Sequence, residues 1–387
     1  MSSLRRLAFL PLIWLCACSS KPAGSPSTGG SGGAAGADAG SGGTPGDASS
    51  DAPAAPYTIN AFDNVRIGSD SSKPNFQNAT ADVDFKDGPF ASVKLIIDLG
   101  TTCYPFDNWQ NDPPPSGQNW PADCDAFDRN FEFSLDDPAD PGVGPPAIEL
   151  VRAITPFGGP EHLEVDITDV ANGLPGKHML RTHISTYSDA AGKVSGSNGG
   201  WNVTAKIEVV PGKAPHKVLA VVPLFNGNEG ATDTLTPPGF NVPAGTTSAR
   251  IEYRATGHGG ATGDLPACQG PAEEFCHRTD TLSVDGATAS SFEPWRTDCD
   301  KLCTIQHQNT SSGGFDYCME NPSGAIASVK APRANWCPGS MTPPYLLTSK
   351  AAPALIAAGQ HTFSWKFSNI ADGGTWRLSA TYFAFGD

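Results

Sequence analysis

The chain has 387 residues, with 43 glycines, 35 prolines and a formal net charge of −15 at pH 7. So many helix-breaking residues argue against long helices, and the acidic balance without a basic stripe argues against nucleic acid as a partner. The negative charge is compatible with a neutral or sugar-like ligand, and solubility alone would explain it equally well.

The N-terminus has the pattern of an export signal. Arg5 and Arg6 precede an apolar run that ends at Leu15 and is too short to span a bilayer as a mature helix. Leu15 stands three residues before Cys18, with a small residue just before the cysteine, and this resembles a bacterial lipobox. The resemblance implies a lipoprotein signal peptide over residues 1–18, lipidation of Cys18 and anchoring in the outer membrane, on the cell surface or in the periplasm. The alternative is ordinary secretion with cleavage nearby.

Residues 19–56 consist almost entirely of Gly, Ala, Ser, Pro, Thr and Asp. Such a segment has too little apolar surface to form a core, so it predicts a disordered, flexible tether. The tether would hold the folded body away from the lipid. No other stretch of the sequence is long and apolar enough to cross a membrane.

From residue 57 onward, apolar and polar residues alternate with a period of two. The alternation is clear at residues 92–99, 249–254 and 363–367, and turn-rich stretches such as Asn226–Gly230 separate the alternating runs. This pattern predicts half-buried strands joined by loops. We therefore expect an all-β body of sandwiches or jelly rolls, long enough for two domains.

Eight cysteines remain after the N-terminal region, and an even number in an exported protein predicts four disulfides of undetermined connectivity. They are Cys103, Cys124, Cys268, Cys276, Cys299, Cys303, Cys318 and Cys337. A zinc site built from Cys299, Cys303 and Cys318 is the alternative, although the spacing is loose and no CxxC is present. There is no HExxH motif and no glycine-rich phosphate loop, so we expect no metal and no cofactor.

Two acidic segments lie beside cysteines. One is CDAFDR (Cys124–Arg129), and the other is EEFCHRTDTL (Glu273–Leu282), which contains Glu274. A disulfide fixes the backbone next to it, and general acid–base catalysis needs carboxylates in fixed positions. The alternative is that both are solvated loop acids next to ordinary disulfides.

These two segments and RANWCPG (Arg333–Gly339) resemble the signature segments of the bacterial peptide N-glycosidase F family. Further similar segments occur in the same order: FDNV (Phe62–Val65), RAITPF (Arg152–Phe157), LEVDITDV (Leu163–Val170), AVVPLF (Ala220–Phe225) and ATGHGG (Ala255–Gly260). The resemblance implies two eight-stranded antiparallel jelly-roll sandwiches side by side, over residues 57–212 and 213–387. The active site would lie in the cleft between them.

The resemblance also implies the activity. Members of the family are amidases that cleave the bond between an asparagine side chain and the first N-acetylglucosamine of an N-linked glycan. They leave aspartate on the peptide and release the intact glycan, without a metal or covalent nucleophile. The expected partner is an N-linked glycoprotein or glycopeptide, and we expect a monomer that meets the membrane only through its lipid anchor.

By the same resemblance, Asp128 and Glu274 are the two catalytic carboxylates. Mutual repulsion and burial would separate their pKa values, so that one stays ionised while the other holds a proton. Arg129 would help to recognise the chitobiose core, and Arg333 would support the site. For either arginine, the alternative is a salt bridge that orders a neighbouring carboxylate.

Three further positions are implied to bind substrate: Tyr187, Ser185 and His258. Ser185 stands where the family has a third acidic residue, which is a departure from the family pattern. Tyr187 replaces the aromatic beside that residue, and Phe127 and Phe275 replace tryptophans. These changes leave the base in place but alter the walls that would hold the sugar.

Two residues next to the motif positions, Asp125 and Glu273, are not expected to take part. The loss of the third acidic residue favours an alternative function, a non-catalytic glycan-binding surface lipoprotein. A third possibility is a double jelly-roll enzyme that acts on another amide or sugar. The two retained carboxylates favour catalysis, because a lectin does not need a matched pair.

The family also implies disulfide pairings: Cys103–Cys124, Cys268–Cys276 and Cys299–Cys337. The remaining cysteines would form an added bridge, Cys303–Cys318. The loop between the first pair is longer than the family version, and its aromatic residues are Tyr104, Phe106, Trp109 and Trp120. We expect these rings either to stack on sugar rings or to pack the loop onto the first domain.

Overall fold

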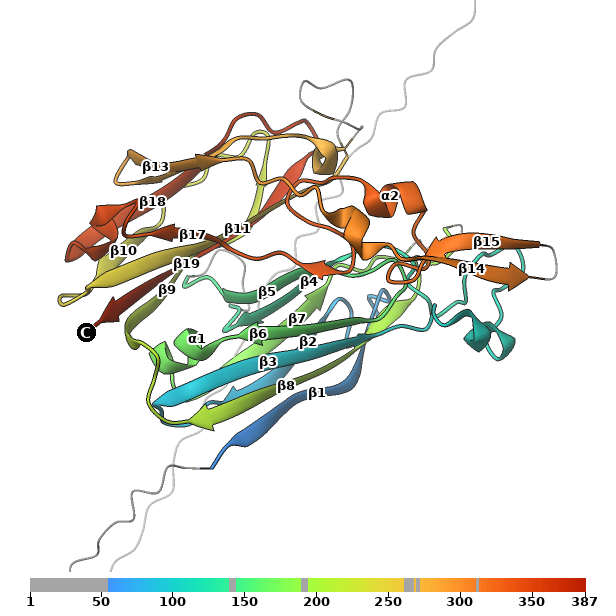
Figure 1. Cartoon of the computed structure of the whole chain (residues 1–387), viewed down its shortest axis with the longest axis horizontal. Coiled ribbons are helices and arrows are strands. Elements are labelled where there is room, and N and C mark those ends of the chain that lie inside the picture. Colours follow the sequence, from blue (N-terminus) through green and yellow to red (C-terminus); the bar gives the residue numbers. More distant parts are fainter. Residues whose placement is uncertain (1–54, 139–143, 189–193, 261–267, 269–271, 311–312) are drawn as a thin grey trace, which may run out of the picture. The chain divides into compact units, whose positions relative to one another are not determined.

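The structure is a computed structural model that describes residues 55–138, 144–188, 194–260, 268, 272–310 and 313–387. In these ranges it consists mainly of antiparallel strands (Figure 1), which confirms the all-β class. The expected signal peptide, the lipidated Cys18 and almost all of the tether lie outside the described residues. Among the described helices, we find none with the length and apolar character needed to cross a bilayer.

The first sandwich contains the strands β1 to β8. They are β1 (Tyr57–Gly68), β2 (Asn78–Asp84), β3 (Phe90–Gly100), β4 (Asn130–Leu135), β5 (Ile148–Ile154), β6 (Glu161–Asp166), β7 (Lys177–Ile184) and β8 (Gly200–Pro211). One sheet has the order β1-β8-β3-β6 and the other has the order β5-β4-β7-β2. A two-residue strand from the second half of the chain, β16 (Ser340–Met341), extends the second sheet beside β5. Apart from β16, this is the strand order of a jelly roll.

The second sandwich repeats this arrangement. Its strands are β9 (Lys217–Gly230), β10 (Gly239–Val242), β11 (Ser248–His258), β12 (Asp280–Val284), β13 (Ala287–Phe292), β17 (Tyr345–Thr348), β18 (Gly359–Phe367) and β19 (Thr375–Gly386). The two sheets have the orders β9-β19-β11-β17 and β10-β18-β12-β13. Within the described ranges, the structure therefore contains the two eight-stranded sandwiches that the family resemblance implies.

Short elements fill the connections. They are the hairpin β14 (Ile305–Thr310) and β15 (Gly313–Cys318), the helices α1 (Thr168–Gly173) and α2 (Ile326–Lys330), and the 3-10 turns η1 (Phe106–Gln110), η2 (Glu273–Phe275), η3 (Cys299–Leu302) and η4 (Pro353–Ile356). The turn η2 carries one of the expected catalytic carboxylates, and the hairpin lies in an insertion of the second sandwich.

The period-two alternation predicts the strands correctly because each sandwich buries one face of each sheet. In β3, Val93, Leu95, Ile97 and Leu99 are buried in the core of the first sandwich. Corresponding residues of β11 and β18 are buried in a separate core, which surrounds Trp376. Burial of these apolar side chains stabilises each sandwich.

The prediction of a loop at Asn226–Gly230 is wrong. These residues form the end of β9 and pair with β19, from Asn226 opposite Ser379 to Gly230 opposite Thr375. The Asn226 side chain also donates a hydrogen bond to the carbonyl of Ala147 in the first sandwich. Pairing and packing with distant residues outweigh the turn propensity of the local sequence.

All four expected disulfides are present: Cys103–Cys124, Cys268–Cys276, Cys299–Cys337 and Cys303–Cys318. The zinc alternative is excluded, because each of its three candidate ligands is half of a disulfide. The first two bridges fix the backbone beside Asp128 and Glu274, as the sequence predicts.

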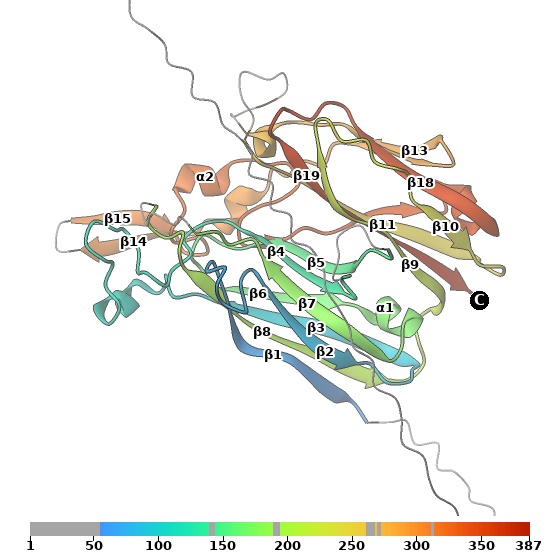
Figure 2. The ribbon, with the colours of Figure 1, turned by 180° about the vertical axis from the view of Figure 1, so that it is seen from behind.

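The two sandwiches meet through β4 and β5 on one side and β9 and β19 on the other (Figure 2). Arg377 of β19 forms two hydrogen bonds with the Glu132 carboxylate of β4, of 2.8 and 2.7 Å. Arg152 of β5 donates a hydrogen bond to the main-chain carbonyl of Arg377. The junction is therefore polar and charged, and these pairs fix one sandwich against the other.

Candidate active site

Asp128 lies in a short, tightly held segment just before β4. The Cys103–Cys124 disulfide secures the segment on one side. On the other side, the hydroxyl of Thr155 accepts a hydrogen bond of 2.9 Å from the Arg129 amide and donates one of 3.1 Å to the Phe127 carbonyl. The backbone is thus fixed on both sides of Asp128.

Glu274 is presented by η2 in the second sandwich, and its neighbour Glu273 anchors this turn. The Glu273 side chain is fully buried and accepts hydrogen bonds from Arg278, at 2.8 and 2.9 Å, and from Trp376, at 2.9 Å. It also accepts one from the amide of Ala371. While these contacts hold Glu273 in the second sandwich, Glu274 remains partly exposed, with 24% of its side chain accessible.

Arg333 holds the Glu274 carboxylate. Its guanidinium donates a hydrogen bond of 2.9 Å to Glu274, and it also donates to the carbonyl and hydroxyl oxygens of Ser328. The guanidinium lies 4.8 Å from the ring centre of Phe275 and 4.5 Å from that of Trp336. Arg333 is almost completely buried, so its charge acts in a medium that screens it weakly.

Asp128 interacts electrostatically with this pair. Burial raises the pKa of Asp128 to about 7, Arg333 opposes the rise and the negative charge of Glu274 adds to it. Burial also raises the pKa of Glu274, but its hydrogen bond and ion pair with Arg333 favour the ionised form. The structure therefore brings together one carboxyl group that titrates near neutral pH and a second one that is paired with a cation.

Arg129 is positioned by Asp125, a residue that the sequence analysis set aside. The Arg129 Nε lies 3.1 and 3.0 Å from the two Asp125 carboxylate oxygens, and a terminal nitrogen lies 2.9 Å from one of them. Both side chains are buried. The guanidinium also lies 4.5 Å from the ring centre of Tyr187 and 5.0 Å from that of Phe127.

The three further positions differ in their surroundings. Tyr187 is 46% exposed and covers Arg129, so its ring can contact a bound ligand. Ser185 follows β7 directly, and its amide donates a hydrogen bond of 3.0 Å to the carbonyl of Asn130 at the start of β4. Both therefore lie on the segment that runs beside Asp128.

His258 is linked to Glu274 indirectly, through Trp336 and Arg333. Its Nε2 lies 2.8 Å from the Thr256 hydroxyl oxygen, and its ring stacks on Trp336, which in turn contacts Arg333. Burial lowers the pKa of His258 to about 3, so the imidazole is neutral at physiological pH. These contacts give His258 a supporting position behind Arg333.

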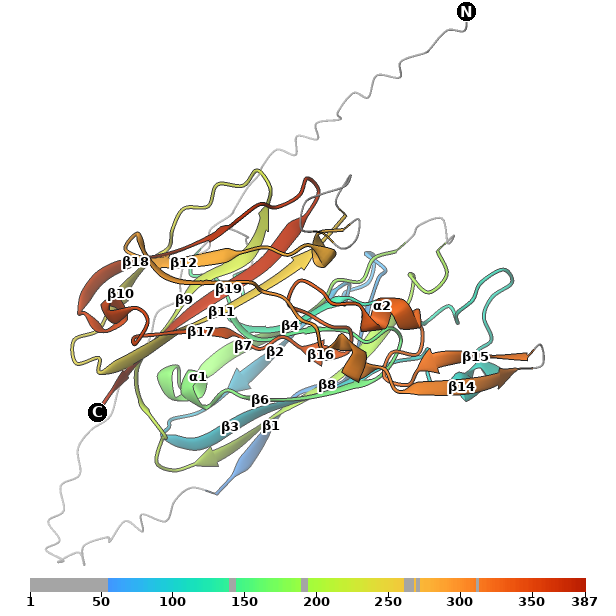
Figure 3. The ribbon, with the colours of Figure 1, turned by 45° about the horizontal axis from the view of Figure 1, so that its top comes forward.

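The aromatic rings of the long disulfide loop pack on other rings. Phe106 is buried and makes edge-to-face contacts with Phe315 and Tyr317 of β15, as does Trp109 with Trp120. Figure 3 shows β15 beside this part of the chain. The loop aromatics thus pack within the protein, as one alternative predicts: Trp120 packs onto Cys124 and Ala126 of the first domain, and Phe106 packs onto the inserted hairpin.

Asp125 and Glu273 are the residues that sequence reasoning missed. Each lies next to a motif position and forms a buried ion pair within a few residues, Asp125 with Arg129 and Glu273 with Arg278. The short spacing of opposite charges was the available signal. Among the described residues, we find no cluster of three or more His, Cys, Asp or Glu side chains arranged to hold a metal ion.

Comparisons with known proteins identify similar sequences and folds. Residues 227–382 match the family model described as peptide-N-glycosidase F, C terminal. A relative from Elizabethkingia miricola, peptide-N(4)-(N-acetyl-beta-D-glucosaminyl)asparagine amidase F, is 25% identical over 244 residues, which cover 59% of this chain and 60% of the relative. The match therefore spans less than two thirds of that protein.

Solved structures share the fold. Recombinant peptide:N-glycanase F superposes with a TM-score of 0.61 at 20% identity, covering 86% of this chain and 96% of that chain. PNGF-II superposes with the same TM-score and identity, covering 85% of this chain and 65% of that chain. A glycosylasparaginase from Flavobacterium meningosepticum gives a TM-score of 0.59 at 19% identity, with coverage of 86% and 96%. The solved structures show that the chain shares their fold, and the family model and the relative show that parts of it are similar in sequence to peptide N-glycosidase F.

Proposed function

We propose that the protein is an amidase that hydrolyses the bond between asparagine and N-acetylglucosamine in N-linked glycoproteins or glycopeptides. It releases the intact glycan and leaves aspartate in the peptide. The observation that carries this proposal is the electrostatic coupling of Asp128, from the first sandwich, with the Glu274–Arg333 pair of the second sandwich. A site for binding alone does not need a second carboxyl group and a cation that both act on the pKa of a buried carboxyl group.

In this mechanism, Asp128 is the general base. A pKa near 7 suits a group that must accept and return a proton at neutral pH. Asp128 takes a proton from a water molecule, whose oxygen bonds to the carbon of the side-chain amide. The carbon–nitrogen bond then breaks, the proton passes to the leaving nitrogen, and the products are aspartate and a glycosylamine.

The surrounding groups orient the reactants. Arg333 fixes Glu274 and contributes positive charge close to the amide oxygen, where negative charge develops in the transition state. Arg129 and the exposed ring of Tyr187 form a surface for the sugars next to the scissile bond. None of these roles requires a metal or a cofactor.

One observation favours a second function, glycan binding without cleavage. Ser185 provides no carboxylate at the third acidic position, and its amide is engaged with the carbonyl of Asn130. If that third carboxylate is essential for turnover, the protein binds the glycan and leaves the amide intact.

The test uses the full chain, folded under oxidising conditions, with a high-mannose glycopeptide as substrate. Mass spectrometry follows the peptide, and Asp128→Asn serves as the control. We expect conversion of asparagine to aspartate with release of the intact glycan by the wild type, and no conversion by Asp128→Asn. A wild type that binds the glycopeptide without cutting it would contradict the amidase and support the binding protein.

We also propose that the protein is exported and anchored as a monomeric outer-membrane lipoprotein. The four disulfides support export, since such bridges persist in oxidising compartments. Metabolic labelling with a fatty acid tests the anchor. The proposal expects label on the wild type and none on Cys18→Ala, and an unlabelled wild type would contradict it.

A further inference from the structure

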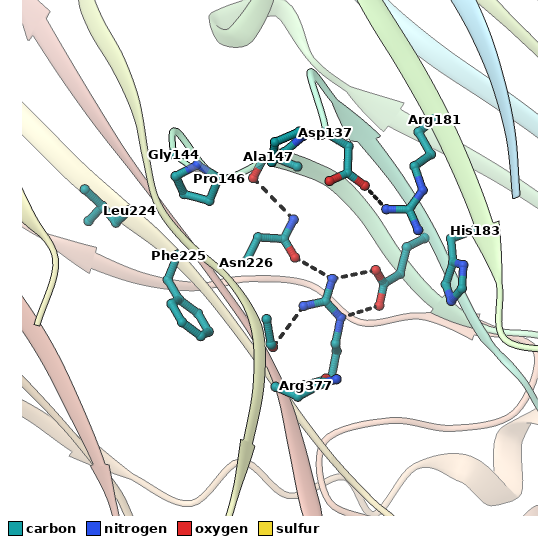
Figure 4. Close-up of a pocket in the computed structure, with 14 residues that line it drawn as sticks. Asp137, Gly144, Pro146, Ala147, Arg181, His183, Leu224, Phe225, Asn226 and Arg377 are labelled. Carbon is teal, nitrogen blue, oxygen red and sulfur yellow. Dashed lines mark hydrogen bonds and ion pairs between the residues drawn. The ribbon is translucent and has the colours of Figure 1, made fainter. Parts of the chain in front are cut away.

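A cavity of about 450 Å³ lies where the two sandwiches meet. Its walls come from β4, β7 and the segment after β4 in the first sandwich, and from β9 and β19 in the second (Figure 4). Asp128, Glu274 and Arg333 do not line it. We infer that this cavity is a subsite for a neutral hexose of the glycan, beyond the sugars nearest the asparagine, an inference that rests on the proposed function.

The polar wall of the cavity is charged but balanced. Arg377 is paired with Glu132 by two hydrogen bonds, and Arg181 forms an ion pair with Asp137. Burial lowers the pKa of His183, which favours the uncharged form of its imidazole. Two cations and two anions cancel, so the lining gives no preference for a charged ligand. Hydroxyl groups suit such a wall, since each can accept from a guanidinium and donate to a carboxylate.

The opposite side of the cavity carries apolar residues beside the polar Asn226 and Asn228. It includes Leu224, Pro146 and Phe225, and the Phe225 ring is supported by Trp365 with 4.8 Å between ring centres. A pyranose has an apolar face of C–H groups and a polar rim, so it can contact both walls at once. The cavity volume also falls within the range of about 300–1,000 Å³ that is usual for small-ligand sites.

A row of polar residues connects the cavity to Asp128. Asn130 follows Asp128 by two residues, and Glu132 lies on the same face of β4 because side chains alternate along a strand. His183 of β7 lies opposite Glu132 in the strand pairing of β4 and β7. The Ser185 amide donates a hydrogen bond to the Asn130 carbonyl. Glu132 is thus roughly 7 Å beyond Asn130 along the strand. In the proposed arrangement, a glycan with its amide at Asp128 follows the direction of this row and places a later sugar in the cavity.

The experiment measures saccharide binding to the full chain by isothermal titration calorimetry. The probes are mannotriose, for the cavity, and N,N′-diacetylchitobiose, for the region beside Asp128. Neither contains the asparagine amide, so binding is measured separately from cleavage. Asn228→Trp places a large ring at an exposed position that lines the cavity, and Asn241→Trp, on an exposed position of β10, is the matched control.

We expect Asn228→Trp to weaken mannotriose binding at least about tenfold, or about 1.4 kcal/mol, and to leave chitobiose binding unchanged. Asn241→Trp should change neither. His183→Gln, which adds no bulk, should also weaken mannotriose binding selectively. The inference is overturned if mannotriose does not bind the wild type, or if neither cavity variant weakens its binding, whatever the result with the glycopeptide. If mannotriose binds as expected but the glycopeptide is not cleaved, the subsite stands and the proposed amidase fails.

Discussion

Arg333 of the second sandwich donates a hydrogen bond of 2.9 Å to Glu274, and both groups act on the pKa of Asp128 from the first sandwich. The two carboxyl groups are therefore not equivalent. Burial raises the pKa of both, but Glu274 is hydrogen-bonded to Arg333, whereas Asp128 is influenced by the charges of Arg333 and Glu274 and has a pKa of about 7. In the proposed mechanism Asp128 is the group that transfers the proton, and several predictions depend on how Arg333 and Glu274 shift its pKa.

Removing the charge of Glu274 should lower the pKa of Asp128. The Glu274 carboxylate is a negative charge that raises that pKa, so Glu274→Gln should move the Asp128 titration below its wild-type midpoint near pH 7. Carbon-13 NMR of the labelled aspartate side chains measures the shift directly. Glu293→Gln, at an exposed site, should leave the titration unchanged. An upward shift in Glu274→Gln would contradict the assigned coupling.

Removing the charge of Arg333 should have the opposite effect. Arg333 lowers the pKa of Asp128, so Arg333→Gln should raise it above 7 and leave less of the base ionised at neutral pH. If Asp128 is the base, kcat/KM of the wild type rises as pH increases through about 7, and the variant should need a more alkaline pH to reach its plateau.

The control for this change is Arg296→Gln. Arg296 pairs with Asp298, and its backbone bonds to that of Arg333, but it is not among the groups that shift the pKa of Asp128. Its pH profile should match that of the wild type. A shift to lower pH in Arg333→Gln would be incompatible with the proposed electrostatics.

Glu273 should matter for stability. Glu273→Ala leaves Arg278 buried without its carboxylate and removes the acceptor of the Trp376 hydrogen bond. Breaking a buried pair in this way costs about 3–5 kcal/mol of the free energy of unfolding. Chemical denaturation measures the loss, and Glu293→Ala, at an exposed site, should change stability by less than about 0.5 kcal/mol. Equal stability of the two variants would exclude the anchoring role of Glu273.

Asp125 should act through Arg129. Asp125→Asn keeps a hydrogen-bond acceptor but removes the charge that fixes the guanidinium beneath Tyr187. Small displacements of positioning groups can cost up to about 100-fold in rate, so kcat/KM for a glycopeptide should fall. Because Arg129 is proposed to bind sugar, most of the loss should appear in KM. A loss confined to kcat, with KM unchanged, would argue against this role.

The sequence predicts the strands well where one face of a sheet is buried. Val93, Leu95 and Ile97 alternate because the core of the sandwich lies on one side of β3. The prediction of a loop at Asn226–Gly230 is wrong because the segment has the composition of a turn but forms part of β9. Its pairing with β19 and the contacts of Asn226 with Ala147 and Arg377 depend on residues far away in the sequence.

In the candidate site, too, some residues can be recognised from local sequence and others only from the fold. Asp128 and Glu274 were open to prediction, because they lie in short motifs beside cysteines that resemble those of a known family. Asp125 and Glu273 were not, because an acidic residue in a loop is usually solvated and only the folded structure reveals that both are buried with a cation. The cavity likewise involves strands from both sandwiches, and no local pattern encodes their approach.

The most direct test of the central claim is the fate of water oxygen during cleavage. A glycopeptide is incubated with the full chain in H₂¹⁸O, and the peptide product is analysed by tandem mass spectrometry. Asp128-dependent hydrolysis of the side-chain amide predicts aspartate at the former glycosylation site with one heavy oxygen in its side chain, and no such product from Asp128→Asn. A peptide that retains N-acetylglucosamine on asparagine, or labelled aspartate formed equally by Asp128→Asn, would contradict the account.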